Sequence, residues 1–120
     1  MKRLAYAALG LVLAGLAIAD AITQHTGWWQ LIVFAIAPDL SMLAGMSSGL
    51  QRGQLHPRAV PIYNAVHRFW APAVLVAVSL LLHDPAWLAA GLAWCAHIAL
   101  DRSLGFGLRT REGFQRIQAA

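Results

Sequence analysis

The sequence predicts an all-α integral membrane protein, built as an antiparallel bundle of four transmembrane helices. Of its 120 residues, 59% are hydrophobic and only 12% are charged, which is too little charge to cover a soluble domain. A helix needs about 20 mostly apolar residues to cross the hydrocarbon core of a bilayer. The chain offers four such segments, at about residues 4–22, 28–46, 60–82 and 87–108. Because they fill nearly all of residues 1–120, we expect a single membrane domain with short loops.

Basic residues predict the orientation of this bundle. They lie before the first span, between the second and third, and after the fourth, at Lys2, Arg3, Arg52, Arg58, Arg109, Arg111 and Arg116. The loops at 23–27 and 83–85 contain no lysine or arginine. By the positive-inside rule, both termini then face the cytoplasm. The formal charge of +4 follows from this topology and from contact with anionic headgroups, and it does not indicate a nucleic-acid partner.

The first span has no ionisable group before Asp20 and is predicted to be a packing helix. Small residues let helices approach closely in lipid, and here they are Ala8, Gly10, Ala14 and Gly15. A second interpretation stays open, because the basic start, the apolar run and residues 17–19 also resemble a cleavable signal peptide. Its removal would leave three spans and break the alternation of basic loops.

The second span places Pro38 and Asp39 near its middle. Proline removes the hydrogen bond to the carbonyl of Phe34, so we expect a kink with a freed carbonyl close to a carboxylate. Inside a bilayer such a break survives only where protein or a polar cavity satisfies the backbone. Two interpretations remain open at this point. One is a functional site, and the other is a simple kink in which Asp39 caps the half-helix behind it.

The third and fourth spans add polar side chains at helical spacing. His67 and Arg68 follow Asn64 by three and four residues, so a helix places all three on one face. His97 and Asp101 are also four residues apart. That spacing presents two metal ligands on one face, or lets a carboxylate fix the tautomer of an imidazole.

Depth in the membrane connects these positions. Trp28, Trp29 and Trp87 are predicted to anchor the bundle at the outer interface. At about 1.5 Å per helical residue, the ionisable groups lie roughly 15 to 24 Å from these outer anchors, all in the cytoplasmic half. Each such group in hydrocarbon costs roughly 2.5 to 3.5 kcal/mol, so several at a similar level indicate a functional site. The predicted interior cluster consists of Asp39, Asn64, His67, His97 and Asp101, with Arg68 and Arg102 nearby.

Two explanations of this cluster follow from the residues alone. Two imidazoles and two carboxylates on three helices form a ligand set suited to zinc, manganese or iron. The other explanation is a metal-free network, in which two arginines neutralise the two aspartates while the amide and the imidazoles complete the hydrogen bonds. The arginines of that network would be Arg68 and Arg102.

The motif blocks resemble a known family. They are Ala-Pro-Asp-Leu-Ser-Met-Leu at 37–43, Tyr-Asn-Ala-Val-His at 63–67, and Ala-His-Ile-Ala-Leu-Asp-Arg-Ser-Leu-Gly-Phe-Gly-Leu at 96–108, followed by Gly113 and Phe114. Over nearly the whole chain they look like the small bacterial membrane proteins catalogued as domain of unknown function 4260. This resemblance implies a four-helix protein of the bacterial inner membrane, and it supplies no reaction.

A looser similarity points toward chemistry. The order Pro-Asp, His-Arg and His-x-x-x-Asp also resembles the membrane-bound metal-dependent hydrolases of bacteria. The matching positions are Pro38, Asp39, His67, Arg68, His97 and Asp101. The chain departs from that pattern at residues 69–72, Phe-Trp-Ala-Pro, where the hydrolases supply a further histidine, so one expected ligand is missing. The analogy is associational and by itself establishes no activity.

We therefore predict a metal-dependent hydrolase-like enzyme that acts on a lipid or lipid-linked phosphate from the cytoplasmic side. Its metal ligands and catalytic groups would be Asp39, His67, His97 and Asp101, and its substrate-binding groups Asn64 and Arg68. An alternative stays open, namely a proton-coupled carrier working as a homodimer, or a structural protein with a metal-free ionic network. Haem ligation by the two histidines is disfavoured by a difference in depth of about 9 Å.

Overall fold

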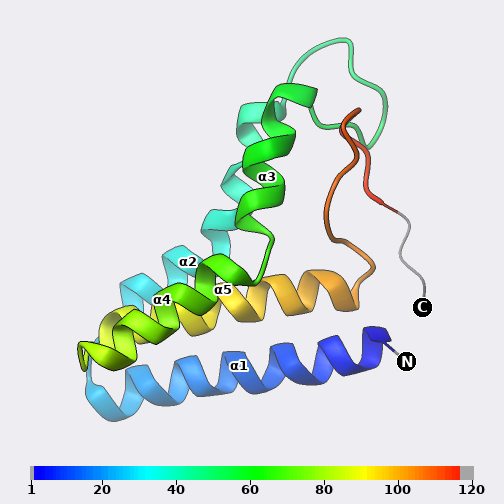
Figure 1. The fold of residues 1–120 in the computed structure, drawn as a ribbon. Helices are drawn as coiled ribbons and strands as arrows, with labels where there is room; N and C mark the ends of the chain where they lie inside the picture. The colour runs from blue at the N-terminus through cyan, green and yellow to red at the C-terminus, as the bar shows by residue number, and fades with distance from the viewer. Residues whose placement is uncertain (1, 117–120) are drawn as a thin grey trace.

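The computed structural model describes residues 2–116 and has only helices as regular elements in that range (Figure 1). In chain order the elements are α1 (Lys2–Gln24), α2 (Trp28–Leu40), the 3-10 turns η1 (Leu43–Gly45) and η2 (Pro57–Ala59), α3 (Val60–Val66), α4 (Trp70–Leu81) and α5 (Pro85–Ser103). Residues 1 and 117–120 of the predicted domain lie outside the described residues. The all-helical prediction is confirmed for the part of the chain that is described.

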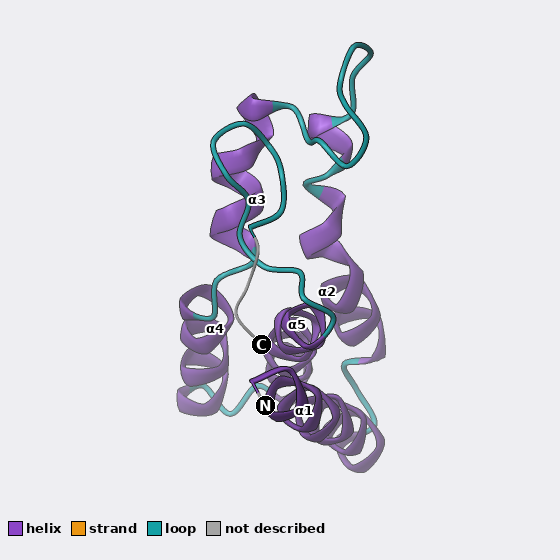
Figure 2. Cartoon of the chain, turned by 90° about the vertical axis from the view of Figure 1, so that its right-hand side faces the viewer, coloured by secondary structure: helices purple, strands orange, loops and turns teal. Residues whose placement is uncertain are grey.

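The central helix is α5. Viewed nearly end-on, it lies among α1, α2 and α4, and it contacts all three (Figure 2). Its buried residues are mostly small, namely Ala89, Ala90, Gly91, Ala93, Cys95, Ala96, Ile98 and Ala99. A side chain at Gly91 would begin 2.7 Å from Val76 of α4, and one at Gly10 would begin 2.7 Å from Leu100. Small residues therefore bring the neighbouring backbones close to α5, as expected for helices packed in lipid.

Only part of the small-residue prediction for the first span holds. Gly10 is buried against α5, but Ala8 and Gly15 are exposed, and nothing lies within 4 Å of a Cβ built at Gly15. The residues of α1 that are fully buried further along are Ala17 and Ala21. The contact face of α1 thus follows the helical repeat rather than small size alone.

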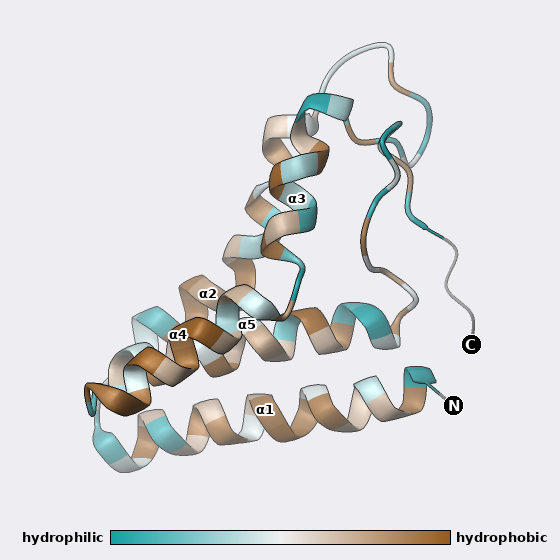
Figure 3. Ribbon diagram, viewed as in Figure 1, coloured by the Kyte–Doolittle hydropathy of each residue, from teal (hydrophilic) through white to brown (hydrophobic). Residues whose placement is uncertain are grey.

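Three segments of residues 2–116 are long and apolar enough to cross a membrane. They are Lys2–Gln24, Trp28–Gly45 and Pro57–Leu81. Hydrophobic residues make up most of α1, α2 and α4, whereas hydrophilic residues are frequent in the C-terminal segment, residues 104–116 (Figure 3). The helix α5, which was predicted as the fourth span, is not among these segments, because its second half carries His97, Asp101 and Arg102. Such residues suit a helix that faces its neighbours more than lipid.

The third predicted span, 60–82, is not one continuous helix. Its first part, α3, ends at Val66, and α4 begins at Trp70 after a turn at residues 67–69. Pro72 gives the physical reason. In a continuous helix its ring would clash with the carbonyl of Arg68, to which it has no N–H to donate.

Side chains of α5 satisfy the carbonyls that this break leaves free. Trp94 donates its Nε1–H to the carbonyl of Val66 at 2.8 Å, and Arg102 donates to the carbonyl of His67 at 3.3 Å. Non-helical backbone at membrane depth is tolerated where protein supplies such partners. The break is therefore supported by the central helix.

The second and fourth predicted spans also end earlier as α-helices. α2 ends at Leu40, two residues after Pro38, and the chain reaches Gly45 through a turn and η1. α5 ends at Ser103 rather than near residue 108. There Gly105 has φ 91°, its N–H donates to the carbonyl of Arg102, and the next N–H donates to the carbonyl of Asp101. This is a Schellman motif, in which a glycine in the left-handed conformation ends a helix.

An arm built from η1, η2, α3 and the C-terminal segment rises away from the layer of α1, α4 and α5 (Figure 1). Several hydrogen bonds join the C-terminal segment to the rest of this arm. The N–H of Leu55 donates to the carbonyl of Gly113 at 2.9 Å, and Asn64 pairs with the backbone of Arg109. The arm and the helical layer meet at the turn after α3.

Candidate metal centre

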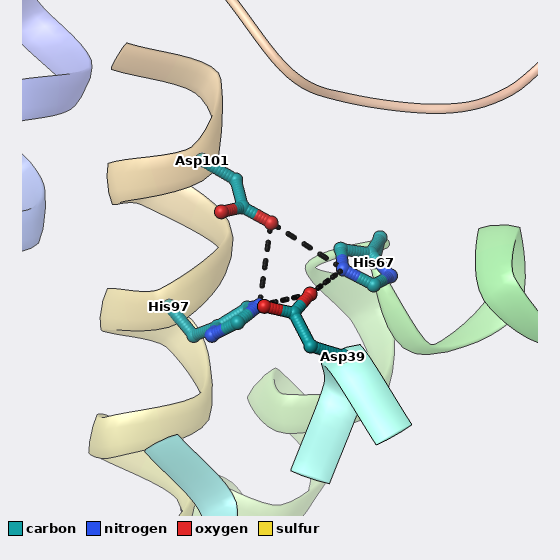
Figure 4. A group of neighbouring side chains, drawn as sticks. All are labelled: Asp39, His67, His97 and Asp101. Carbon is teal, nitrogen blue, oxygen red and sulfur yellow. Dashed lines mark hydrogen bonds and ion pairs between the residues drawn. The ribbon is translucent and has the colours of Figure 1, made fainter. Parts of the chain in front are cut away.

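Four ionisable side chains converge where the arm meets the helical layer (Figure 4). Asp39 lies in the last turn of α2, His67 lies in the turn after α3, and His97 and Asp101 lie on successive turns of α5. Each residue offers one ligand atom, and these four atoms all lie within 4.8 Å of one another. The predicted convergence of these four residues is confirmed, whereas Asn64, the fifth predicted member, lies outside the cluster.

The nitrogen and oxygen atoms of the cluster alternate around a closed ring. His67 Nε2 lies 3.3 Å from Asp39 Oδ1 and 3.3 Å from Asp101 Oδ2. His97 Nε2 lies 3.2 Å from the same two oxygens. A regular tetrahedron with metal–ligand bonds of about 2.0 to 2.1 Å has edges of about 3.3 to 3.4 Å. The four N–O distances therefore match four of the six edges of such a tetrahedron.

The other ring nitrogen of each histidine is held by a backbone carbonyl. His67 Nδ1 lies 2.8 Å from the carbonyl oxygen of Tyr63, and His97 Nδ1 lies 2.7 Å from that of Ala35. A carbonyl oxygen only accepts hydrogen bonds, so Nδ1 carries the hydrogen in both rings. In the neutral imidazole, Nε2 then presents its lone pair to the carboxylates. The cluster is consistent either with a bound cation or with two protonated imidazoles.

His97 binds the carbonyl of Ala35, which is next in sequence to the carbonyl of Phe34 that Pro38 was predicted to free. The missing N–H of Pro38 frees the carbonyl of Phe34, whereas His97 uses the carbonyl of Ala35, one residue further on. Asp39 does not act as the cap of a following half-helix, because its Oδ1 faces both imidazoles. The functional interpretation of Pro38 and Asp39 is therefore favoured over the simple kink.

The arginine-neutralised network is not formed. Within residues 2–116, every ion pair that involves Asp39 or Asp101 joins it to a histidine, and no lysine or arginine nitrogen lies within 4 Å of either carboxylate. Arg68 is exposed. Arg102 binds the carbonyl of His67 and lies 5.5 Å from the ring of Phe69. The two carboxylates are thus left to the imidazoles or to a cation.

Haem ligation by the two histidines does not fit this arrangement. The ring centroids of His67 and His97 are 5.5 Å apart, at an interplanar angle of 60°. Both carboxylate oxygens lie within 3.3 Å of both Nε2 atoms, in the space that a porphyrin would need between the imidazoles. The ligand set suits a compact ion.

The two predicted substrate-binding residues lie outside the cluster. Asn64 donates its Nδ2–H to the carbonyl of Arg109 at 3.0 Å, and its Oδ1 accepts the N–H of Arg109 at 2.7 Å. The amide therefore anchors the C-terminal segment. Arg68 follows His67 in the sequence, and its side chain is exposed. Its assignment to a substrate phosphate stays a prediction.

Sequence reasoning gave no role to Tyr63, which supports His67 in two ways. Its carbonyl accepts the Nδ1–H bond, and its ring stacks on the imidazole with centroids 4.0 Å apart and an interplanar angle of 17°. The position of Tyr63, four residues before His67, is a signal for the carbonyl contact. Two residues of the C-terminal segment also contact this tyrosine: Arg109 Cζ lies 4.8 Å from the ring centroid, and Gln115 donates its Nε2–H to the hydroxyl.

The cluster lies between two cavities. One, of about 190 Å³, is apolar except at its end and is lined by Ala14, Ala17, Ile18, Leu31, Ala35, Ala93, Ala96, His97, Leu100 and Asp101. The other, of about 160 Å³, lies under the C-terminal segment and is lined by Asp39, Met42, Tyr63, Asp101, Phe106, Arg109 and Gln115. Asp101 borders both cavities. The side chain of Asp39 is the most accessible of the four, with 47% of its surface exposed.

The sequence model of the family described as Domain of unknown function (DUF4260) matches residues 4–118. The chain belongs to this family. No curated protein and no solved structure matches it. The family description names no reaction, so the chemistry of this DUF4260 protein has to be inferred from its site.

Proposed function

We propose that this DUF4260 protein holds a divalent metal, namely zinc, manganese or iron, at its Asp/His cluster and hydrolyses a lipid or lipid-linked phosphate. The ligands would be Asp39, His67, His97 and Asp101. One observation carries the proposal. Backbone carbonyls bind the Nδ1–H of both histidines, so both Nε2 atoms face the same two carboxylate oxygens at 3.2 to 3.3 Å. Hydrogen bonds of this kind orient the histidine ligands of metal sites.

The chemistry follows from the ligand set and its surroundings. A divalent metal held there supplies Lewis acidity toward a phosphoryl or carbonyl oxygen. The protein would orient both imidazoles through the carbonyls of Tyr63 and Ala35. The accessible carboxylate of Asp39 borders the polar cavity, which is the side from which a headgroup could reach the cluster.

The proposal includes four membrane spans with both termini in the cytoplasm of a bacterial cell, in its inner membrane. Three apolar segments surround α5, which would complete the bundle as the fourth span. The N-terminal end of α1 lies beside the C-terminal end of α5, where Arg3 approaches Gly105. These two ends would then face the same side of the membrane, and anionic headgroups would contact the basic residues there.

Metal analysis of the protein purified in detergent tests this proposal. We expect about one equivalent of metal per chain, lost in His97→Asn and retained in His25→Asn. His25 is an exposed residue with φ 54°, a conformation that asparagine tolerates, so the same substitution serves as a matched control. Protein that binds no zinc, manganese or iron, even after incubation with each ion, would contradict the metal centre.

A second candidate function is favoured by the ion-pair distances. Two protonated imidazoles would neutralise the two carboxylates without any metal, which suits a proton-coupled carrier working as a homodimer. In proteoliposomes this candidate predicts a proton flux that is lost in Asp39→Asn and unchanged by a chelator. A flux that a chelator abolishes would instead favour the metal centre.

A further inference from the structure

The apolar cavity is positioned to hold part of a ligand that also reaches the cluster. It has a volume of about 190 Å³ and lies between α1, α2 and α5. All of its lining side chains are alanine, leucine or isoleucine except for His97 and Asp101. The cavity therefore has an apolar body and one polar end, and that polar end consists of two proposed metal ligands.

Small side chains keep this space open. Five alanines line it, and α1 and α2 pack on α5 while making few contacts with each other. Larger residues at Ala14 of α1 or Ala35 of α2 would fill it. A lining made mostly of alanine, leucine and isoleucine favours apolar molecules over water. The shape thus favours a hydrocarbon ligand.

The surroundings of the cavity indicate where this hydrocarbon comes from. Ile18, which lines the cavity, is 43% exposed on the outer face of α1, among other exposed apolar side chains of α1 and α2. That face belongs to two segments apolar enough to cross a membrane. An alkyl chain could therefore enter from the bilayer with its polar group directed toward His97.

We propose that this cavity binds one acyl chain of a membrane lipid and places the polar linkage of that lipid at the Asp/His cluster. The headgroup would then occupy the polar cavity on the other side of Asp101. This inference rests on the proposed function for the identity of the reacting group, and it adds the site at which the acyl chain of that lipid is held. Binding of the chain itself needs no metal.

A photoreactive hexadecanol tests whether the apolar cavity binds an acyl chain, and this cavity is called the chain site below. The probe is an uncharged fatty alcohol with a diazirine in its chain, cross-linked to the full protein in detergent and located by peptide mass spectrometry. We expect labelling on the cavity faces of α1 and α5, removed by excess unlabelled hexadecanol. Ala14→Leu should lower this labelling about tenfold, because a hydrophobic pocket discriminates by about that factor or more against each methylene that it cannot hold.

Matched variants keep this test separate from folding and from the metal. Ala19→Leu introduces the same side chain at an exposed position of α1 outside the cavity and should leave the labelling unchanged. Ala35→Leu repeats the test from α2, in case Ala14→Leu fails to fold. Labelling that resists competition, or that persists in both cavity-filling variants, would overturn the chain site.

Removal of the metal distinguishes this inference from the proposed function. In the protein stripped of its metal by a chelator, the labelling should persist. Competable labelling in a protein that binds no metal would support the chain site and contradict the metal centre. Metal at one equivalent without competable labelling would overturn the chain site and leave the metal centre standing.

Discussion

At the scale of single residues, the histidine orientation has the strongest consequences. Nδ1 of His67 and of His97 is bound to a carbonyl, so only Nε2 is available to a metal or to a proton. A proton and a metal ion therefore compete for the same atom in each ring. The two candidate functions differ in which of the two occupies that atom.

This competition predicts a pH dependence of metal binding. Zinc affinity should fall as the pH is lowered, because both imidazoles must be deprotonated to bind and protonation removes their lone pairs. Zinc titration of detergent-purified protein at several pH values measures this. An affinity that stays constant over the range would mean that the histidines are not the ligands.

Tyr63 provides a second residue-scale prediction. Tyr63→Leu removes the ring that stacks on His67 and should weaken metal affinity by about tenfold, the lower end of the effect of losing residues that orient a ligand. Tyr63→Phe is the matched control, since it keeps the ring and loses only the hydroxyl bound by Gln115. Metal titration compares the two variants. Equal affinities would show that the ring does not position His67.

At the scale of elements, the break between α3 and α4 decides where His67 lies. Had the third span been continuous, its carbonyls would have been bound within the helix. The break instead leaves the carbonyl of Val66 to Trp94 and that of His67 to Arg102. The central helix thus fixes the turn that carries a proposed ligand.

Removal of the tryptophan donor tests this support. Trp94→Phe keeps an aromatic ring but leaves the carbonyl of Val66 without the donor, which should cost about 1 to 3 kcal/mol of stability. Trp70→Phe is the matched control, because Trp70 is 62% exposed. Denaturant titration in detergent measures both. A Trp94→Phe protein as stable as the control would mean that the break needs no such bond.

Local sequence signals account for much of this architecture. The helices and the convergence of the four ionisable residues were predicted from hydropathy and depth, whereas α2 continues through Pro38 to Leu40. The break between α3 and α4 and the end of α5 were not predicted, although Pro72 and Gly105 indicate them in the sequence. The partner of Asn64 could not be predicted in this way, because Arg109 lies 45 residues away and is brought close only by tertiary structure.

At the scale of the whole molecule, the antiparallel packing of α1 on α5 brings the start of α1 close to the end of α5. Figure 1 shows the start of α1 and the end of α5 at the same end of the helical layer. The cluster lies toward that end, because His97 and Asp101 belong to the last two turns of α5. Topology therefore decides from which compartment the site is reached.

Reporter fusions test the topology. Green fluorescent protein joined to the C-terminus should fluoresce, and alkaline phosphatase inserted in the loop at 23–27 should be active, because the basic residues predict a cytoplasmic C-terminus and an outer loop. The same reporters exchanged between the two sites are the control. Active phosphatase at the C-terminus would reverse the orientation and place the cluster near the outer face.

The C-terminal segment forms one wall of the polar cavity, through Phe106, Arg109 and Gln115. It is fastened there by the paired hydrogen bonds between Asn64 and Arg109. If the proposed headgroup binds in this cavity, a larger headgroup would displace this wall by breaking these bonds. Discrimination between small and bulky lipid headgroups would therefore depend on the strength of the hydrogen bonds that hold the C-terminal segment. Weaker hydrogen bonds would broaden the range of lipids accepted.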